Sequence, residues 1–200
     1  NGYDKQEFDK VKSTRPDYFN IVFTGVLSEN NNYEIFLKAI KTLDPIKNNL
    51  NIKFNLAGNI EKDIIDSFSN FVKTKSAGYL SHNEAISFMK SSHLLVNFNY
   101  QGTNKPDMIS GKLIEYLATG SPIINISHTN SESESLISLS EDSVTASQHD
   151  LDKIVSYISK RYINWFKGEF KEKIPNKSYA IFDVTNKPGK FFENENIVNF

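Results

Sequence analysis

A lysine and a glutamate lie three residues apart at the start of a predicted helix, directly after a glycine-containing loop. Apolar spacing predicts this helix over Lys112 to Thr119, and Gly120 takes the position of a C-terminal cap. Free backbone N–H groups and the helix dipole make the first turn, with Lys112, an anion site. Glu115 lies one turn further in, where a carboxylate can accept hydrogen bonds from a vicinal diol such as a ribose. The alternative is an ordinary helix start with both side chains in solvent.

The sequence lacks residues that other phosphate-binding and metal-binding motifs require. A P-loop needs Gly six residues before its lysine and Ser or Thr after it, where this chain has Pro106 and Leu113. No Gly-x-Gly-x-x-Gly follows the first predicted strand. The chain has no cysteine, and His128 and His149 have no acidic or histidine partner at metal-ligand spacing, so we expect neither thiolate chemistry nor a metal site.

Short apolar runs alternate with segments of helical periodicity along most of the chain. The helix starting at Ser81 has Glu84 at the spacing of a capping box. Strands are expected at 21–26, 52–58, within 73–80, and at 94–98, 122–126 and 143–147; helices at 33–43, 64–72, 81–89, 112–119, after Ser131, and at 151–166. This order predicts an α/β fold with a doubly wound, Rossmann-like parallel sheet. Ligands bind beyond the carboxyl ends of such strands, so the segments after Val26, Gly58, Leu80 and Phe98 are the candidate site.

Composition narrows the class of protein further. The 200 residues carry 23 basic and 24 acidic side chains, and this balance gives no support to nucleic-acid binding. No stretch approaches the roughly 20 apolar residues of a transmembrane helix, and the first residues given do not form an apolar segment of signal-peptide type. The chain begins at Asn1 rather than Met, which indicates a trimmed or processed product. We predict a linker over 1–19, one domain over 20–166 and an extension over 167–200.

The segment from Gly111 to Ile124, GKLIEYLATGSPII, resembles the signature helix of family-4 glycosyltransferases, in their bacterial polysaccharide branch. Three further segments resemble this family in the right order. Residues 1–8 are similar to its interdomain crossing, and 23–27 with 36–40 to the first strand and helix of its C-terminal domain. Residues 78–96 are similar to the unit that holds the nucleotide base. Together the four segments span residues 1 to about 140.

The resemblance implies a role for particular residues. Glu115 matches the glutamate that binds the donor ribose, and Gly25 matches a glycine where the backbone approaches the phosphates. The earlier of the family's two acidic residues, placed in the catalytic set, falls on Asp107. The remaining matches are backbone contacts: to the diphosphate from Ser110, Gly111, Lys112 and Leu113, and to the base from Tyr79 and Leu80.

The resemblance also implies an activity. The chain is expected to be the donor-binding C-terminal half of a GT-B enzyme, which has two Rossmann-like domains. Such an enzyme transfers a hexose from a nucleotide-sugar with retention, here in polysaccharide or glycoconjugate synthesis. The donor is a substrate, and no cofactor or metal is implied. The implied partners are the missing N-terminal domain and a sugar or lipid-linked acceptor. The implied location is the cytoplasm, with the full-length protein peripheral at the inner face of the membrane, and the fragment is expected to be inactive alone.

Two departures from the family pattern keep other functions open. Many relatives carry Arg just after the first-strand glycine and Lys a few residues on, where this chain has Val26 and Asn30 to Asn32. Lys105, Lys112 or the absent half could replace these cations, or the chain could be an inactive or altered-donor member. The rival functions are a non-catalytic scaffold domain and a different Rossmann-like enzyme, such as a nucleotide-sugar epimerase.

Several isolated residues have simpler structural explanations. We predict that His82 lies on the surface and that His93, just before a strand, is structural. The aromatic residues Tyr162, Trp165 and Phe166 fall at helical spacing and are expected to pack in the core, although an interdomain role is open. The helix-start carboxylates Glu132 and Glu134 are expected to be solvated.

Overall fold

The computed structural model describes residues 2–100, 111–140, 142–170 and 180–181. Its main feature is a six-stranded, fully parallel sheet in the order β4-β3-β2-β5-β6-β7. The strands are β2 (Phe19–Leu27), β3 (Ile52–Ile60), β4 (Lys73–Ser76), β5 (Leu94–Phe98), β6 (Ile123–Ile126) and β7 (Val144–Ala146). This is the doubly wound strand order of a Rossmann-like domain, so the predicted fold class is confirmed.

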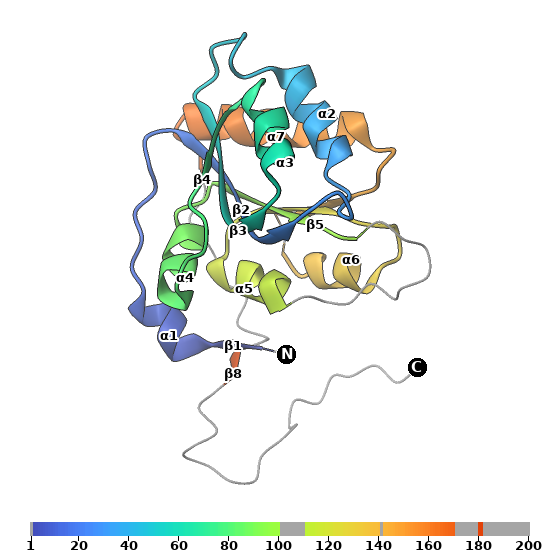
Figure 1. Cartoon of the computed structure of the whole chain (residues 1–200). Helices are drawn as coiled ribbons and strands as arrows, with labels where there is room; N and C mark the ends of the chain where they lie inside the picture. The colour runs from blue at the N-terminus through green and yellow to red at the C-terminus, as the bar shows by residue number, and fades with distance from the viewer. Residues whose placement is uncertain (1, 101–110, 141, 171–179, 182–200) are drawn as a thin grey trace, which may run out of the picture.

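Helices cover both faces of the sheet (Figure 1). One face carries α2 (Glu34–Leu43), α3 (Lys62–Ser69) and α7 (Leu151–Phe166). The other carries α4 (His82–Lys90), α5 (Gly111–Thr119) and α6 (Glu132–Ile137). Among the described residues, no helix combines the length and apolar character needed to cross a bilayer. The layers result from the alternation of side chains along buried parallel strands, which sends successive residues to opposite faces.

The two faces have different cores. Beneath α2, α3 and α7, phenylalanine rings pack against one another, with Phe54 and Phe68 at 4.8 Å between ring centroids. Beneath α4, α5 and α6 the core is mainly aliphatic, with Leu95 and Ile123 of the sheet facing Leu117 of α5. The aromatic side accounts for much of the chain's high phenylalanine content.

The segment predicted as a linker contains structure of its own. A two-residue strand, β1 (Tyr3–Asp4), pairs in parallel with β8 (Ala180–Ile181), and α1 (Lys5–Lys10) follows it. The Asp4 side chain caps α1 by accepting a hydrogen bond from the backbone N–H of Glu7 at 3.0 Å. Phe8 is buried against α4 and α5, so this segment is packed onto the domain.

The central strands separate at their carboxyl ends. Strand β2 pairs with β3 along its whole length, from Phe19 to Leu27. It pairs with β5 only at Ile21 and Val22. The strand order reverses at this point, and the resulting gap between β2 and β5 is where ligands of doubly wound sheets bind.

Candidate donor-binding site

Lys112 reaches from the first turn of α5 into the gap between β2 and β5. Its Nζ lies 4.4 Å from the centroid of the Phe23 ring and 3.5 Å from the position that a Cβ on Gly25 would occupy. Burial lowers the pKa of its ammonium group to about 8. The ammonium makes a cation–π contact with the Phe23 ring. Within the described parts of the chain, no carboxylate forms an ion pair with it. A partly buried cation of this kind favours an anionic ligand.

Tyr116 fills the same gap one helical turn later. Its hydroxyl oxygen accepts hydrogen bonds from the Thr24 backbone N–H at 2.8 Å and from the Thr24 hydroxyl at 3.3 Å. The backbone N–H is buried at the point where β5 no longer pairs with β2. Burial raises the pKa of the Tyr116 hydroxyl, so the group stays neutral. Tyr116 therefore ties α5, and with it Lys112, to the end of β2.

Replacing Tyr116 with phenylalanine should lower the free energy of unfolding by about 1–3 kcal/mol, because the buried Thr24 N–H loses its partner. Urea denaturation measures the change. Tyr79→Phe is the matched control, since the Tyr79 side chain is 93% exposed and should tolerate the loss of its hydroxyl. Equal midpoints for the two variants would show that the Tyr116 hydrogen bond contributes nothing.

Gly25 and Gly58 face each other across β2 and β3 at the edge of the site. They are register partners, and both have positive φ, of 121° and 113°. A Cβ on Gly58 would lie 2.1 Å from the Gly25 carbonyl oxygen, whereas a Cβ on Gly25 would, among the described residues, meet the Lys112 side chain at 3.5 Å. Gly58 thus allows the backbone of Gly25 to take its position. The sequence indicated Gly58 as a strand end and gave it no role in the site.

Glu115 lies half-buried on α5, close to a histidine and a second glutamate. Desolvation raises the pKa of its carboxyl group, the nearby His82 lowers it, and Glu7 raises it. His82 begins α4 and forms an ion pair with Glu7 of α1, with 3.2 Å between Nε2 and Oε2. The prediction that His82 lies on the surface holds, since its side chain is 52% exposed. The sequence did not indicate its pairing with Glu7.

The segment matched to base binding is anchored at the end of β3. The Gly78 carbonyl accepts a hydrogen bond from the Gly58 N–H at 2.7 Å. Tyr79 is fully open to solvent, and Leu80 is partly buried. The predicted capping box is confirmed: the Ser81 side chain caps the N3 backbone, and Glu84 accepts from the Ser81 N–H at 2.8 Å.

The structure describes some, but not all, of the remaining residues that were matched to the family. Gly111 is exposed, and no heavy atom of the described residues lies within 4 Å of where its Cβ would be. The Leu113 side chain belongs to the core, which leaves only its backbone for ligand contact. Ser110, Asp107 and Lys105 lie outside the described residues.

Uncharged residues occupy the positions where many relatives carry phosphate-binding cations. Val26 is 54% exposed at the end of β2. Asn31 and Asn32 are buried and fasten the loop after β2 to the exit of β5. The Asn32 N–H donates to the Asn99 carbonyl at 2.9 Å, and its side-chain amide donates to the Tyr100 carbonyl at 3.4 Å. We call Asn31 and Asn32, with these contacts to the exit of β5, the clasp. Among the described residues, Lys112 is the cation that lies near the Cβ position of Gly25.

Sequence reasoning also missed a buried polar network behind the site. Asn97 and Asn125 are buried on adjacent strands, and the Asn97 amide donates to Asn125 Oδ1 at 2.7 Å. Asn125 donates in turn to Ser133 at 3.0 Å, and Asn99 donates to Ser127 at 2.8 Å. The available signal was asparagine at alternating positions of otherwise apolar strands. This network holds the carboxyl ends of β5 and β6 and the start of α6 together.

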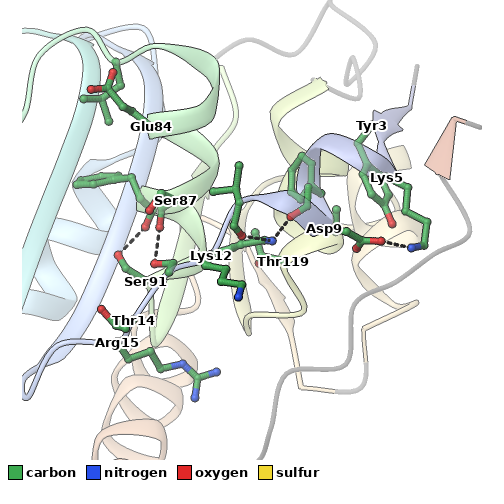
Figure 2. Close-up of a pocket in the computed structure, with 17 residues that line it drawn as sticks. Tyr3, Lys5, Asp9, Lys12, Thr14, Arg15, Glu84, Ser87, Ser91 and Thr119 are labelled. Carbon is green, nitrogen blue, oxygen red and sulfur yellow. Dashed lines mark hydrogen bonds and ion pairs between the residues drawn. The ribbon is translucent and has the colours of Figure 1, made fainter. Parts of the chain in front are cut away.

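A broad groove of about 1310 Å³ lies on the flank of the domain, between α1, residues 11–15 and α4 (Figure 2). Lys5, Lys12 and Arg15 contribute positive charge to it. The groove shares only Leu80 with the predicted donor-binding residues, so it is separate from the Lys112 site. No group of three or more His, Asp or Glu side chains in the described ranges could hold a metal ion.

The other isolated residues mostly match their predicted roles. His93 is structural: its Nδ1 accepts from the Asn20 N–H at 3.0 Å, and its ring stacks on Phe19. Tyr162 and Trp165 pack against the core, whereas Phe166 is 74% exposed because α7 ends there.

The family model described as Glycosyl transferase-like matches residues 36–162. That match covers well over half of the chain, so the chain belongs to the glycosyl transferase-like family. The resemblance to glycosyltransferases found in the sequence is thereby confirmed. No curated protein sequence matches the chain significantly.

Solved glycosyltransferases of GT-B type share the fold. The catalytic domain of cholesterol-alpha-glucosyltransferase from Helicobacter pylori has a TM-score of 0.52 and 19% identity, over 76% of this chain and 90% of that one. Anabaena HepE with UDP-glucose has a TM-score of 0.59 and 13% identity, over 85% of this chain and 48% of HepE. The pneumococcal O-GlcNAc transferase GtfA, with UDP and GlcNAc, has a TM-score of 0.54 and 14% identity, over 84% and 32%. The chain thus spans about half of HepE and a third of GtfA.

Proposed function

We propose that this chain binds the nucleotide-sugar donor of a retaining glycosyltransferase, as the C-terminal of its two Rossmann-like domains. The observation that carries the proposal is Lys112, whose poorly solvated ammonium lies against Gly25 at the strand-order reversal. A diphosphate would supply the missing counter-charge, and the first-turn N–H groups of α5 would share it. In the transfer step these donors would stabilise the charge that develops on the leaving diphosphate.

The other donor contacts are assigned from the family resemblance. Glu115 would accept the ribose hydroxyls, the backbone at Tyr79 and Leu80 would meet the base, and Ser110 to Leu113 would contact the phosphates. Asp107 would serve as the acidic residue beside the transferred sugar. Uridine is the base we favour, because HepE, GtfA and an Escherichia coli trehalose-6-phosphate structure are described with UDP or UDP-sugars.

The remaining parts of the proposal concern the whole protein. An N-terminal domain would bring the sugar or lipid-linked acceptor, and residues 1–19 would connect it to the domain at 20–166. The chain alone would then bind donor without transferring sugar. No cofactor or metal takes part in this scheme. We place the enzyme in bacterial polysaccharide or glycoconjugate synthesis, cytoplasmic and peripheral at the inner face of the membrane.

Titrating the chain with UDP, GDP and ADP, followed by backbone amide shifts, tests the proposal. We expect UDP to shift Gly25, Tyr79 to Ser81 and Gly111 to Glu115. Glu115→Ala should weaken UDP binding about tenfold or more, because two ribose hydroxyls lose a charged acceptor. Glu132→Ala is the matched control, since Glu132 is exposed on α6. Absence of shifts with every nucleotide at millimolar concentration would contradict donor binding by this chain.

A second function has one observation in its favour. Val26 and the clasp asparagines occupy the positions of two phosphate-binding cations, which is what a scaffold domain that lost its donor site would show. The two functions differ at Lys112 and Glu115: their replacement weakens nucleotide binding in a donor site and changes no binding in a scaffold.

A further inference from the structure

We propose that a small polar pocket at the carboxyl edge of the sheet binds an uncharged mono- or disaccharide. It lies between the start of α2 and the connection from β7 to α7, two helices on the same face of the sheet (Figure 1). Its volume is about 410 Å³, within the roughly 300–1,000 Å³ of ligand sites in proteins. The residues that line it are Asn32, Glu34, Ile35, Lys38, Gln148 and His149. In the enzyme proposed above this sugar would belong to the acceptor or product glycan, but the pocket itself does not depend on that function.

The side chains around the pocket offer the hydrogen-bonding groups that sugar hydroxyls need. Glu34 supplies a carboxylate that accepts, and Lys38 supplies an ammonium group that donates. Asn32 and Gln148 supply amides, which can do both. The opposite charges of Glu34 and Lys38 balance, so the lining favours a neutral polyhydroxyl ligand over a phosphate or a metal ion. Ile35 is only 7% exposed and provides an apolar surface against which the carbons of a sugar ring can pack.

Hydrogen bonds hold both walls of the pocket in place. On one side the clasp ties Asn32 to the exit of β5. On the other side the Asp150 carboxylate accepts from the backbone N–H of Ser147 at 2.8 Å and from its hydroxyl at 2.9 Å, which fixes the turn before α7. Within this turn the side-chain nitrogen of Gln148 lies 3.3 Å from Nε2 of His149. Because the walls are already ordered, little conformational entropy is lost when a ligand binds.

An exposed aromatic residue beside the clasp is a second, independent indication of a sugar ligand. Tyr100 is 63% exposed, although its carbonyl accepts a hydrogen bond from the Asn32 amide at 3.4 Å. A flat ring whose backbone is held at the surface can stack on the C–H face of a sugar. Two residues earlier, the Phe98 ring lies 5.4 Å from the Phe23 ring, which the Lys112 ammonium also contacts. The pocket, Tyr100 and the Lys112 site therefore follow one another along the carboxyl edge of the sheet.

Titration of the full 200-residue chain with maltose, lactose and N,N′-diacetylchitobiose, followed by backbone amide shifts, tests the site. We expect at least one of these disaccharides to cause saturable shifts at residues 31–35, 100 and 147–149, with a dissociation constant in the millimolar range. Glu34→Ala should weaken this binding about tenfold, because sugar hydroxyls lose a charged acceptor. Tyr100→Ala should weaken it about threefold to tenfold, because the stacking contact is lost. Neither variant should change the affinity for UDP.

Matched controls are Glu132→Ala, which removes an exposed carboxylate on α6, and Tyr79→Ala, which removes another exposed ring. Both should bind the disaccharide as the unaltered chain does. Absence of saturable shifts with all three sugars, equal losses in the controls, or shifts at these residues with inorganic phosphate instead would overturn the saccharide site. Titration of the same sample with UDP separates the two proposals. Sugar binding without UDP binding would leave the pocket and remove the donor function, and UDP binding without sugar binding would do the reverse.

Discussion

Lys112→Met is expected to weaken UDP binding about 30-fold or more while making the unliganded chain more stable. Charge-assisted hydrogen bonds to the diphosphate contribute about 1.5–3 kcal/mol each, and other phosphate-binding cations of the family are replaced here by Val26 and the clasp. Methionine keeps the packing of the stem against Gly25 and removes a desolvated charge. The free energy of unfolding should rise by about 1–3 kcal/mol at neutral pH.

The pH dependence of stability provides a second measurement on the same pair of proteins. The pKa of Lys112 falls from 10.5 to about 8 on folding. Between these values the unfolded chain binds more protons than the folded chain, so the Lys112 contribution to stability rises as pH increases from about 8 to about 10.5. Subtracting the Lys112→Met curve from that of the unaltered chain isolates this rise from other titrating groups.

Lys38→Met, at an exposed position on α2, is the control for both measurements and should change neither. The affinity for UDP should also fall as pH rises above about 8 in the unaltered chain, because the ligand requires the charged lysine. If Lys112→Met binds UDP as well as the unaltered chain, the ammonium does not hold the diphosphate.

Gly58→Ala is expected to have the largest effect on folding, a loss of about 3 kcal/mol or more. The new Cβ would lie 2.1 Å from the Gly25 carbonyl oxygen, and that neighbour is backbone in the middle of a sheet, so it cannot move aside cheaply. The φ of 113° adds strain for any residue with a side chain. Thermal denaturation should show a midpoint lowered by roughly 6–12 °C for a domain of this size.

Gly78→Ala separates the steric clash from the backbone strain. Gly78 also has a positive φ, of 68°, but within the described part of the chain no heavy atom lies within 4 Å of its Cβ position. Its replacement should cost about 1–2 kcal/mol from conformation alone. A Gly58→Ala variant no less stable than Gly78→Ala would contradict the close approach of β2 and β3. Any folded Gly58→Ala protein should bind UDP poorly, since Gly25 is displaced.

The sequence predicted the sheet and most helices because their signals are local. Strand Leu94–Phe98 and helix Leu151–Phe166 have the predicted bounds, and the capping box at Ser81 fixes the start of α4. Helix α1 was missed, since a six-residue helix with one buried residue, Phe8, has no detectable period.

The site could be predicted only in part. The helix-start pattern and the family resemblance singled out Lys112 and Glu115, and their roles in donor binding stay predictions. The role of Tyr116 was not predictable, because it depends on β5 ceasing to pair with β2 after Val22. The pairing of Glu7 with His82 joins residues 75 positions apart, and no local pattern encodes such a contact.

The clasp limits the substitutions that could add a cation to the proposed donor site. A lysine at position 32 would add a cation within the stretch where many relatives carry one, but it would remove the amide that donates to the Tyr100 carbonyl and would bury a charge. The same substitution would strengthen phosphate binding and remove the hydrogen bond that anchors the loop. A second substitution that secures the exit of β5 would have to come first. Adding the lysine without losing the loop anchor would therefore take two substitutions, made in that order.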